Sequence, residues 1–459
     1  MDDWTVPKAN DAIHISLVPP SSFPESQKTH SFNPALTYQL FDNETIYGYK
    51  NLSVDLQFRQ DDMSPSLCVK YDEKLPTAGA SSADAEDEEK IDQVEEILQG
   101  YLPSDTPSTL DLSPSSFTPP GALVNTYTRD NSTYEIYHSN LSDPQTRTLI
   151  HRMQILVLFF IEAGSAIDTQ EEDEWLRNRW DVFLLYERLP DSKFSFVGYC
   201  TVHKYWYFTK SPNDTAAGTE FSLDALQSQT FARQYRARIS QFLILPPFQQ
   251  KGHARELYAI IIKTYLAIEE VKEITVEDPS TRFEELRDVA DFKRLKENNI
   301  LSGDVPELLL LRQKPAKEWI ETQRGIAKMP LRQFQRMIEM LLLAKIFQSE
   351  GGDVEHQKHR FELYVKERLY RHNRDVLVQL EKGERAEKLT ETYMNVTVDY
   401  EFLLSKAGQK TSFGDPARKI IAGKRPAGNI STIVEDEEME EEEEEELEPP
   451  SKKMRVRKD

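Results

Sequence analysis

Alternating hydrophobic and polar residues mark several expected strands along the first part of the chain. Leu52–Phe58 alternates in this way and predicts a small β-containing domain within Ala12–Tyr71. Farther along, Asp181–Glu187 and Phe194–Phe208 are rich in aromatic and β-branched residues. Because the turn-forming sequence LPDS lies between these two runs, we expect an antiparallel hairpin.

Other segments have the period of a helix. Arg147–Ile167 has apolar residues at helical spacing and predicts a largely buried helix. The strand-like run Ile239–Leu245 is followed by two prolines and a glycine-containing turn, after which Ala254–Tyr265 has one apolar face. With a further strand at Glu273–Glu277, the order hairpin, strand, turn, helix, strand predicts a mixed α/β layer.

The pattern becomes helical from Pro306 to about Lys406, which predicts a separate helical domain. Residues 77–90 are small, polar and acidic, and they predict an insertion. The end of the chain is acidic at Glu435–Glu448 and basic at Ser451–Asp459, as in disordered tails. The expected domains are therefore an N-terminal domain over 1–140, an α/β domain over 141–300, a helical domain over 301–408 and a tail over 409–459.

Composition and charge narrow the class of protein. A chain of 459 residues with 39% hydrophobic content can form more than one core. The apolar runs are too short to cross a membrane, and the N-terminus lacks a secretory signal, so we expect no membrane contact. Cys68 and Cys200 lack partners at zinc-ligand spacing, so we expect no metal and a reducing compartment. The net charge of −22 disfavours direct nucleic-acid binding and favours a basic protein partner.

The candidate chemistry lies in the turn between the expected strand at 239–245 and the helix after it. Gln249–Ala254 places a glycine and an alanine where the helix begins, so successive backbone N–H groups can converge on an anion such as a pyrophosphate. The positive end of the helix dipole adds to this attraction. A lone Gly-x-Ala also occurs in ordinary strand-to-helix turns, and both interpretations stay open on these residues alone.

The wider sequence around this turn resembles a known family. Gln249, Gly252 and Ala254 match the Q/R-x-x-G-x-G/A signature of the GCN5-related N-acetyltransferase (GNAT) superfamily. The run RISQFLILPPFQQKGHARELY, followed by ITVEDPS and LRD, resembles the type B histone acetyltransferases, and the acidic tail suggests a fungal-type member. The motifs LFDNETIYGYK, FFIEAGS, RWDVFLLYE and VGYCTV extend the resemblance over about Ile13–Leu295. The loop departs from the commonest family loop, Q-G-Q-G-H-G, at Gln250, Lys251 and Ala254.

The resemblance implies a fold, an activity and site residues. The fold would be a GNAT-type mixed sheet flanked by helices, with a small N-terminal α/β domain and a C-terminal helical domain. The activity would be transfer of acetyl from acetyl-CoA to lysine Nζ of free histone H4. Implied catalytic residues are the general base Glu277, with supporting acids Asp278 and Glu162. Implied cofactor-binding residues are Phe242, Leu243, Ile244, Gln249, Gln250, Lys251, Gly252, His253, Ala254, Arg255 and Ser280. Implied histone contacts are Asp42, Asn43, Glu44, Trp180, His203, Lys204 and Tyr205.

Lysine is mostly protonated at neutral pH because its unperturbed pKa is about 10.4, so the reaction needs a base. Glu277 could instead cap the turn that follows it, Glu162 could satisfy a buried polar group, and Trp180 could be core.

Cys200 lies among large aromatic residues, which favours packing over an acyl-carrier role and therefore favours direct attack in a ternary complex. A backbone N–H of the strand 242–244 would then meet the developing oxyanion.

The implied partners are histone H4 with histone H3 and the WD40-repeat histone chaperone typical of the family. A role in chromatin assembly, with residence in cytoplasm and nucleus, follows from the same resemblance, and PPSKKMRVRK resembles a nuclear import signal. Two alternatives stay open. One is a non-catalytic histone escort, and the other is an acetyltransferase of the same fold acting on another protein or a small amine.

Overall fold

The computed structural model describes residues 4–76, 91–114, 116–210, 231–311, 315–349 and 354–411. The expected acidic insertion at 77–90 and the acidic and basic segments at 435–459 lie outside the described residues. The chain divides into two compact units, Met1–Leu342 and Leu343–Asp459.

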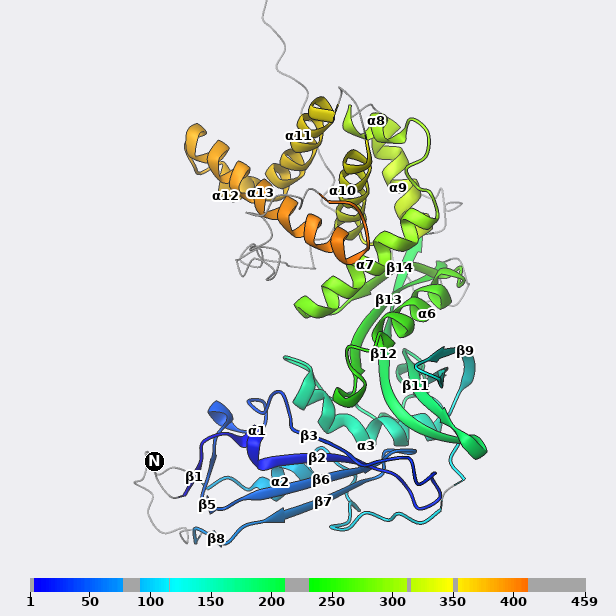
Figure 1. Cartoon of the computed structure of the whole chain (residues 1–459), viewed down its shortest axis with the longest axis vertical. Coiled ribbons are helices and arrows are strands. Elements are labelled where there is room, and N and C mark those ends of the chain that lie inside the picture. The colour runs from blue at the N-terminus through cyan, green and yellow to red at the C-terminus, as the bar shows by residue number, and fades with distance from the viewer. Residues whose placement is uncertain are drawn as a thin grey trace, which may run out of the picture. The chain divides into compact units, whose positions relative to one another are not determined.

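The N-terminal part of the first unit contains a four-stranded sheet in the order β3-β2-β6-β7 (Figure 1, blue). Its strands are β2 (Ile13–Val18), β3 (His30–Phe32), β6 (Ser53–Arg59) and β7 (Pro65–Lys70). Strands β2 and β6 are parallel, and the other neighbours are antiparallel. Val54, Leu56 and Phe58 of β6 are fully buried, which confirms the alternation read from the sequence.

Short elements complete this region. They are β1 (Thr5–Val6), α1 (Ala9–Ala12), the 3-10 turn η1 (Asp42–Glu44), β4 (Ile46–Tyr47), β5 (Tyr49–Lys50), β8 (Glu73–Lys74) and α2 (Val94–Gln99). Strand β1 pairs with β4, and β5 pairs with β8.

A six-stranded sheet in the order β14-β13-β12-β11-β10-β9 forms the centre of the first unit. Its strands are β9 (Ala122–Arg129), β10 (Ser132–Asn140), β11 (Trp180–Leu189), β12 (Lys193–Lys210), β13 (Phe231–Ile244) and β14 (Val271–Val276). Only the β13–β14 pair is parallel among these neighbours. The antiparallel β11–β12 hairpin is confirmed, with η2 (Pro190–Ser192) as its turn. The sheet already begins at Ala122, within the segment that the sequence assigns to the N-terminal domain.

The first unit has further helices, some of which contact this sheet directly. They are α3 (Pro144–Phe160), α4 (Glu174–Arg177), α6 (His253–Leu266), α7 (Thr281–Glu297), α8 (Val305–Leu310) and α9 (Pro315–Ala327), while α10 (Leu331–Gln348) begins in this unit. Helix α6 packs on one face of the sheet, where the hydroxyl of Tyr265 donates to the Asp181 carboxylate at 2.8 Å. Mixed α/β architecture is therefore confirmed.

The helix expected over Arg147–Ile167 is wrong at its C-terminal end. Helix α3 begins earlier, because Asp143 caps its N-terminus by accepting from the Thr146 backbone N–H at 2.9 Å. It ends at Phe160, because Ile161 is extended and Ala163 has a left-handed φ of 53°. The apolar residues beyond Phe160 keep a helical spacing, but the backbone has already turned.

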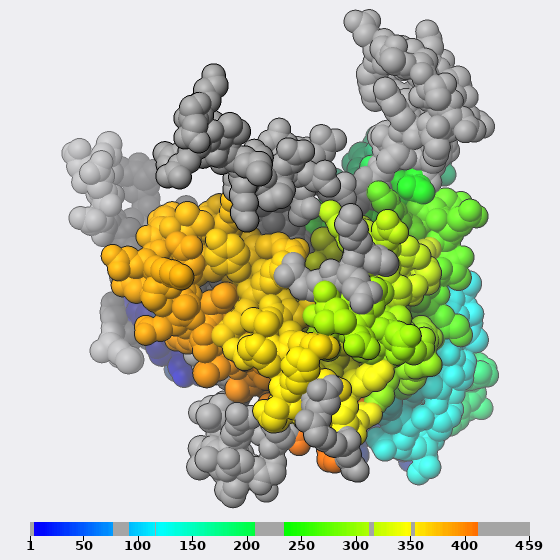
Figure 2. Space-filling view, turned by 90° about the horizontal axis from the view of Figure 1, so that it is seen from above, coloured from blue at the N-terminus to red at the C-terminus, as the bar shows by residue number. Residues whose placement is uncertain are grey.

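The second unit is helical, but it begins at Leu343 and not near residue 301, where the sequence places the start of the helical domain. The helical pattern starts earlier because α8, α9 and the start of α10 already belong to the first unit. The second unit contains the end of α10 together with α11 (Val354–His372), α12 (Arg374–Leu377) and α13 (Lys382–Lys406). Helix α11 packs against α13, and both are visible in the yellow-to-orange part of the surface (Figure 2). Buried Phe361, Val365 and Leu369 form the apolar stripe of α11. Across the parts of the chain that the structure describes, no helix is long and apolar enough to span a bilayer.

Candidate active site

The loop between β13 and α6 is a tight turn built by its own side chains. Gln249 donates from Nε2 to the Ile244 carbonyl at 2.9 Å, and Lys251 donates from Nζ to the Pro247 carbonyl at 2.9 Å. Gln250 and Gly252 both have left-handed backbones, with φ values of 60° and 83°. Gly252 directly precedes α6, so the loop amides and the helix N-terminus come together with no side chain at the glycine. This arrangement suits a phosphate-bearing ligand.

Beyond Ile239, strand β13 separates from its parallel neighbour. The β13–β14 pairing runs from Tyr235 to Ile239, and β14 ends at Val276, while β13 continues to Ile244. Two residues of β13, Ser240 and Gln241, lie between its pairs with Val202 and Cys200, where β12 has one, so β13 contains a bulge at this point. No strand in the described chain pairs with 240–244 on the β14 side. Backbone groups at this free edge can bond an extended ligand.

Glu277 lies at the opening between the two strands. Its backbone N–H donates to the Ile239 carbonyl at 2.8 Å. Its carboxylate accepts from the Ser240 hydroxyl and lies 3.4 Å from Nη2 of Arg238. Because the side chain is 38% exposed, a substrate amine can reach it. These bonds go to β13 rather than to the turn amides, and Ser280 is the residue that caps α7, by accepting from the Phe283 N–H at 3.4 Å.

The other two implied acids lie in exposed turns. Asp278 follows Glu277 with a left-handed φ of 33°. Glu162 lies in the turn after α3, and its exposure excludes the alternative that it satisfies a buried group. No hydrogen bond or ion pair within the described ranges joins Glu162 to Glu277. The Glu162 turn does approach β13, because Gln241 donates from Nε2 to the Ser165 carbonyl at 2.8 Å.

The acidic loop at η1 approaches the same turn. Tyr38, four residues before Asp42, accepts at its hydroxyl from the Ala163 backbone N–H at 2.8 Å. Asp42 and Asn43 are exposed, whereas Glu44 accepts from the Thr37 backbone N–H at 3.0 Å. Of the three implied histone contacts in this loop, Glu44 is therefore partly used in holding the loop.

Aromatic and charged side chains share one face of the central sheet. Strand register places Trp180 beside His203 and His203 beside Arg238, so these side chains point to the face opposite α6. The His203 ring lies 4.6 Å from Trp180 and 4.3 Å from Tyr205, measured between centroids. Burial, with smaller contributions from Arg179 and Arg238, lowers the pKa of His203 to about 4. We call this row of Trp180, His203, Tyr205 and Arg238 the aromatic strip; it leads toward Glu277.

Lys204 does not belong to the aromatic strip. Its neighbours in β12 point to one face, and Lys204 points to the other, where Nζ lies 2.7 Å from Asp181. Asp181 is buried beneath α6, so this lysine stabilises the sheet–helix packing. A direct contact with a peptide on the aromatic strip does not follow from this geometry.

The implied cofactor residues on β13 are of two kinds. Leu243 and Ile244 are buried, so only their backbones can meet a ligand. Phe242 is partly exposed and packs edge-to-face on Phe283 of α7, with 4.9 Å between the ring centroids. Cys200 is fully buried, and burial raises the pKa of its thiol, which supports packing over acyl transfer.

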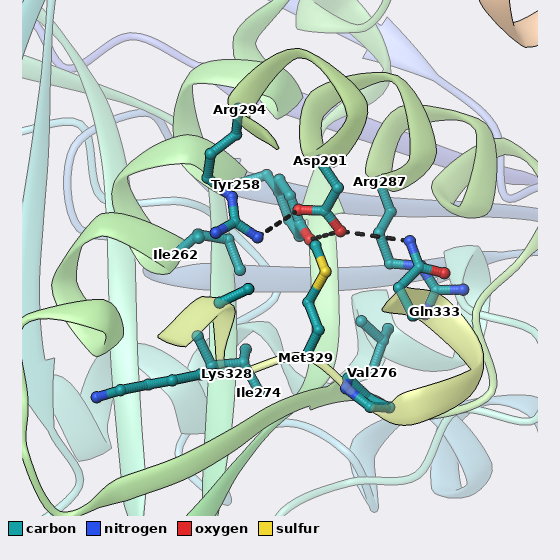
Figure 3. A pocket seen from close by; sticks show the side chains of 12 residues that line it. Tyr258, Ile262, Ile274, Val276, Arg287, Asp291, Arg294, Lys328, Met329 and Gln333 are labelled. Carbon is teal, nitrogen blue, oxygen red and sulfur yellow. Dashed lines mark hydrogen bonds and ion pairs between the residues drawn. The ribbon is translucent and has the colours of Figure 1, made fainter. Parts of the chain in front are cut away.

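A small cavity lies between α6, β14, α7 and the segment that leads into α10 (Figure 3). Its volume of about 20 Å³ is enough for a water molecule and too small for a substrate. Asp291 in its wall accepts from the Tyr258 hydroxyl at 3.2 Å and from Gln333 at 3.3 Å. Burial raises the pKa of Asp291. The cavity is therefore part of the packing that holds α7 against α6.

Some residues at the site were not identified from the sequence. Ser240 and Arg238 contact Glu277 only because β13 and β14 are neighbours. Arg129 of β9 bonds to the Lys251 carbonyl and lies 3.1 Å from Glu256. The alternating sequence TYTRDNSTYEIY, with Asp130 and Asn131 at left-handed φ, contained a hairpin signal for this region. Across the described residues, no group of three or more His, Cys, Asp or Glu side chains is placed to hold a metal.

The chain is similar to known proteins along most of its length. Residues 4–162 match the family model described as the N-terminus of histone acetyl transferase HAT1, and residues 288–346 match the one described as fungal HAT1, C-terminal. A histone acetyltransferase type B catalytic subunit from Aspergillus oryzae is 35% identical, covering 88% of this chain and 86% of that protein. The proteins of the same name from Neurospora crassa and Pyricularia oryzae are 36% and 34% identical, each covering 89% of this chain.

One solved structure has a much weaker similarity. It is an aminoglycoside acetyltransferase from an uncultured soil metagenomic sample, in complex with sisomicin. It has 15% identity and a TM-score of 0.21, and the alignment covers 34% of this chain and 83% of that one. A likeness at this level supports no argument about the present site.

Proposed function

Because the chain belongs to the family of histone acetyltransferase type B catalytic subunits, we propose that it transfers acetyl from acetyl-CoA to lysine Nζ in the tail of free histone H4. The single observation that carries this proposal is the position of Glu277. Its partly exposed carboxylate lies at the opening between β13 and β14, beside the free backbone edge of β13. A base and a binding edge for an acyl donor thus occur together.

The phosphate loop and the strand opening fit the two ends of acetyl-CoA. The loop amides around Gly252 suit a diphosphate, and the free edge of 242–244 suits the amide groups of a pantetheine arm. Acetyl-CoA supplies the activated acetyl thioester. The β13 edge would donate a backbone N–H to the thioester oxygen as negative charge develops there.

Glu277 would serve as the general base. A lysine with an unperturbed pKa of about 10.4 must lose a proton before it attacks, and a carboxylate at the opening can accept that proton. The Ser240 hydroxyl and Arg238 hold the carboxylate toward the opening. Asp278 and Glu162 are exposed acids on the two adjacent turns, and we assign them supporting roles in attracting the ammonium group.

The histone tail would lie across the aromatic strip and approach the acidic loop. Aromatic rings suit the aliphatic stems and cationic ends of lysine and arginine, and the exposed Asp42 adds a negative charge on the acidic loop. The net charge of −22 favours a basic partner. Histone H3 as co-substrate partner, a WD40-repeat chaperone subunit, a role in chromatin assembly, and residence in cytoplasm and nucleus belong to the same proposal.

The test is acetylation of free H3–H4, free H4 and nucleosomes, followed by mass-spectrometric mapping of the modified lysines. We expect free H4 and H3–H4 to be acetylated much faster than nucleosomes, because an acidic protein is not attracted to wrapped DNA. Equal rates on nucleosomes, or modification confined to another histone, would contradict the proposed substrate. Absence of acetyl transfer to a panel of small amines would separate a histone enzyme from a general amine acetyltransferase.

A further inference from the structure

The β9–β10 hairpin lies against the outer side of the phosphate loop. Arg129, at the end of β9, donates from Nη1 to the Lys251 carbonyl and from Nη2 to Glu256 at 3.1 Å. The hydroxyl of Tyr127 and Nδ1 of His253 are hydrogen bonded at 2.7 Å. The Tyr134 ring lies 4.4 Å from the His253 ring, centroid to centroid. Three hairpin side chains therefore hold a loop more than a hundred positions away in the sequence.

The Arg129 guanidinium lies among other positive charges, which is unfavourable as long as no anionic ligand is bound. It lies at the positive end of α6, and Lys251 and Arg255 add two further cations to the same loop. Glu256 offsets part of this charge. Burial, followed by the Arg129 and Lys251 charges, lowers the pKa of His253 to about 4, so the ring adds no positive charge at pH 7. An arriving phosphate would relieve the remaining repulsion.

The hydrogen bond from Arg129 also restricts the backbone conformation of the phosphate loop. Hydrogen bonding to the Lys251 carbonyl fixes the peptide plane between Lys251 and Gly252, and therefore the direction of the Gly252 N–H. A Cβ at position 252 would collide with this guanidinium, so the close approach depends on glycine. The left-handed φ of 83° at Gly252 belongs to the same arrangement.

We propose that Arg129 is a positioning residue of the cofactor site, which holds the Lys251–Gly252 peptide so that the loop amides face a diphosphate. The β9–β10 hairpin is then part of the coenzyme site, although it lies far from the loop in sequence. The inference rests on the proposed use of acetyl-CoA and deepens it by naming what keeps the phosphate loop in shape.

The test compares Arg129→Gln with Arg188→Gln in the full chain. Arg188 is a matched control, because it pairs with Glu135 of the same hairpin at 2.8 Å but does not touch the loop. Isothermal titration should show Arg129→Gln weakening the binding of acetyl-CoA and CoA roughly 10- to 100-fold, the size expected for lost charge-assisted hydrogen bonds. Arg188→Gln should bind as the wild type does, and Arg129→Lys should recover part of the loss.

Two further readouts separate positioning from general damage. With saturating acetyl-CoA, kcat on histone should be unchanged in Arg129→Gln while the KM for acetyl-CoA rises. With S-acetylpantetheine, which has no diphosphate, the variant and wild type should have the same KM. Hydrogen exchange of the 250–255 amides in the ligand-free protein should be faster in Arg129→Gln.

Several outcomes would overturn the proposal. One is unchanged coenzyme affinity in Arg129→Gln, and another is an equal loss with S-acetylpantetheine. Weakened coenzyme binding with unchanged amide exchange would assign Arg129 to direct phosphate contact instead of positioning. If the wild type itself bound no acetyl-CoA, the proposed function would fail, and that result is distinguishable because it does not involve Arg129.

Discussion

At the scale of single residues, the proposed chemistry depends on a carboxylate held by one hydroxyl and one guanidinium. Glu277→Gln keeps the shape of the side chain and removes the proton acceptor, so we expect intact acetyl-CoA binding and a loss of about 10²- to 10⁴-fold in kcat. Raising the pH should partly restore the rate, because solvent then deprotonates the lysine. Titration calorimetry and steady-state kinetics measure the two effects separately.

The matched variants for this prediction are Asp278→Asn and Glu162→Gln, which remove the two neighbouring acids. Smaller losses than in Glu277→Gln are expected for both. A wild-type rate in Glu277→Gln would move the base to whichever of the other two variants is inactive. If none of the three lost activity, the proton would leave by another route and the assignment would be wrong.

A second residue-scale prediction concerns Ser240, whose hydroxyl donates to Glu277. Ser240→Ala removes this bond and leaves the carboxylate to Arg238 alone, so kcat should fall roughly 10- to 150-fold, in line with about 1.5–3 kcal/mol for one hydrogen bond to a charged group. Affinity for acetyl-CoA should not change. Ser16→Ala removes a half-buried hydroxyl of β2 that is bonded to Ser31 in the N-terminal sheet, and this control should leave kcat unaltered. A kcat equal to wild type in Ser240→Ala would mean that the serine does not hold the base.

At the scale of elements, the sequence predicts what is local and misses what depends on pairing. The β11–β12 hairpin is contiguous, so alternation and turn residues predict it. The strand, turn and helix around Gly252 are contiguous too, but only the family signature identifies the turn as a phosphate loop. The aromatic strip depends on the register between β11, β12 and β13, and one sequence does not give a register. The sequence around Arg129 indicates a hairpin, but nothing along the chain indicates that Arg129 contacts Lys251, 122 positions away. Apolar periodicity continues past the backbone turn at Ile161, so it predicts a longer α3 than the structure has.

Gly252 in the phosphate loop can be compared with Gly303, a second glycine with a left-handed backbone that lies outside the loop. Gly252→Ala and Gly303→Ala both place a side chain at positive φ, with φ values of 83° and 58°. Only at Gly252 does the new Cβ meet another group, the Arg129 guanidinium, whereas Gly303 has open space around it. We expect Gly252→Ala to weaken acetyl-CoA binding about tenfold or more, and Gly303→Ala to leave it intact, by titration calorimetry. Equal affinities in both variants would show that the loop tolerates displacement of Arg129.

At the scale of the whole molecule, the excess of acidic residues favours basic partners, and buried histidines make stability depend on pH. The chain has 78 acidic and 56 Lys and Arg residues, so its long-range field attracts basic tails. Such attraction is screened by salt, so the KM for histone should rise as ionic strength rises, while the KM for a short neutral peptide substrate should change little.

Two histidines, His203 and His253, have pKa values lowered to about 4 and remain neutral inside the folded sheet region.

The lowered pKa of His253 makes the stability of the folded chain depend on pH. His253 has a folded pKa of about 4 against a usual 6.5, so between these values the unfolded chain binds a proton that the folded chain does not. The free energy of unfolding therefore falls as pH drops from 6.5 toward 4, by at most about 1.4 kcal/mol per pH unit for one such group. Thermal unfolding at pH 7.5, 6.0 and 4.5 should show Tm falling below pH 6.5.

His253→Gln keeps a polar partner for Tyr127 and cannot be protonated, so its Tm should fall less over the same interval. The slope that remains is expected from His203 and from carboxylates that titrate at the acidic end, and a double variant with His203→Gln should flatten it further. An unchanged slope in His253→Gln would mean that this ring is not kept neutral by its surroundings.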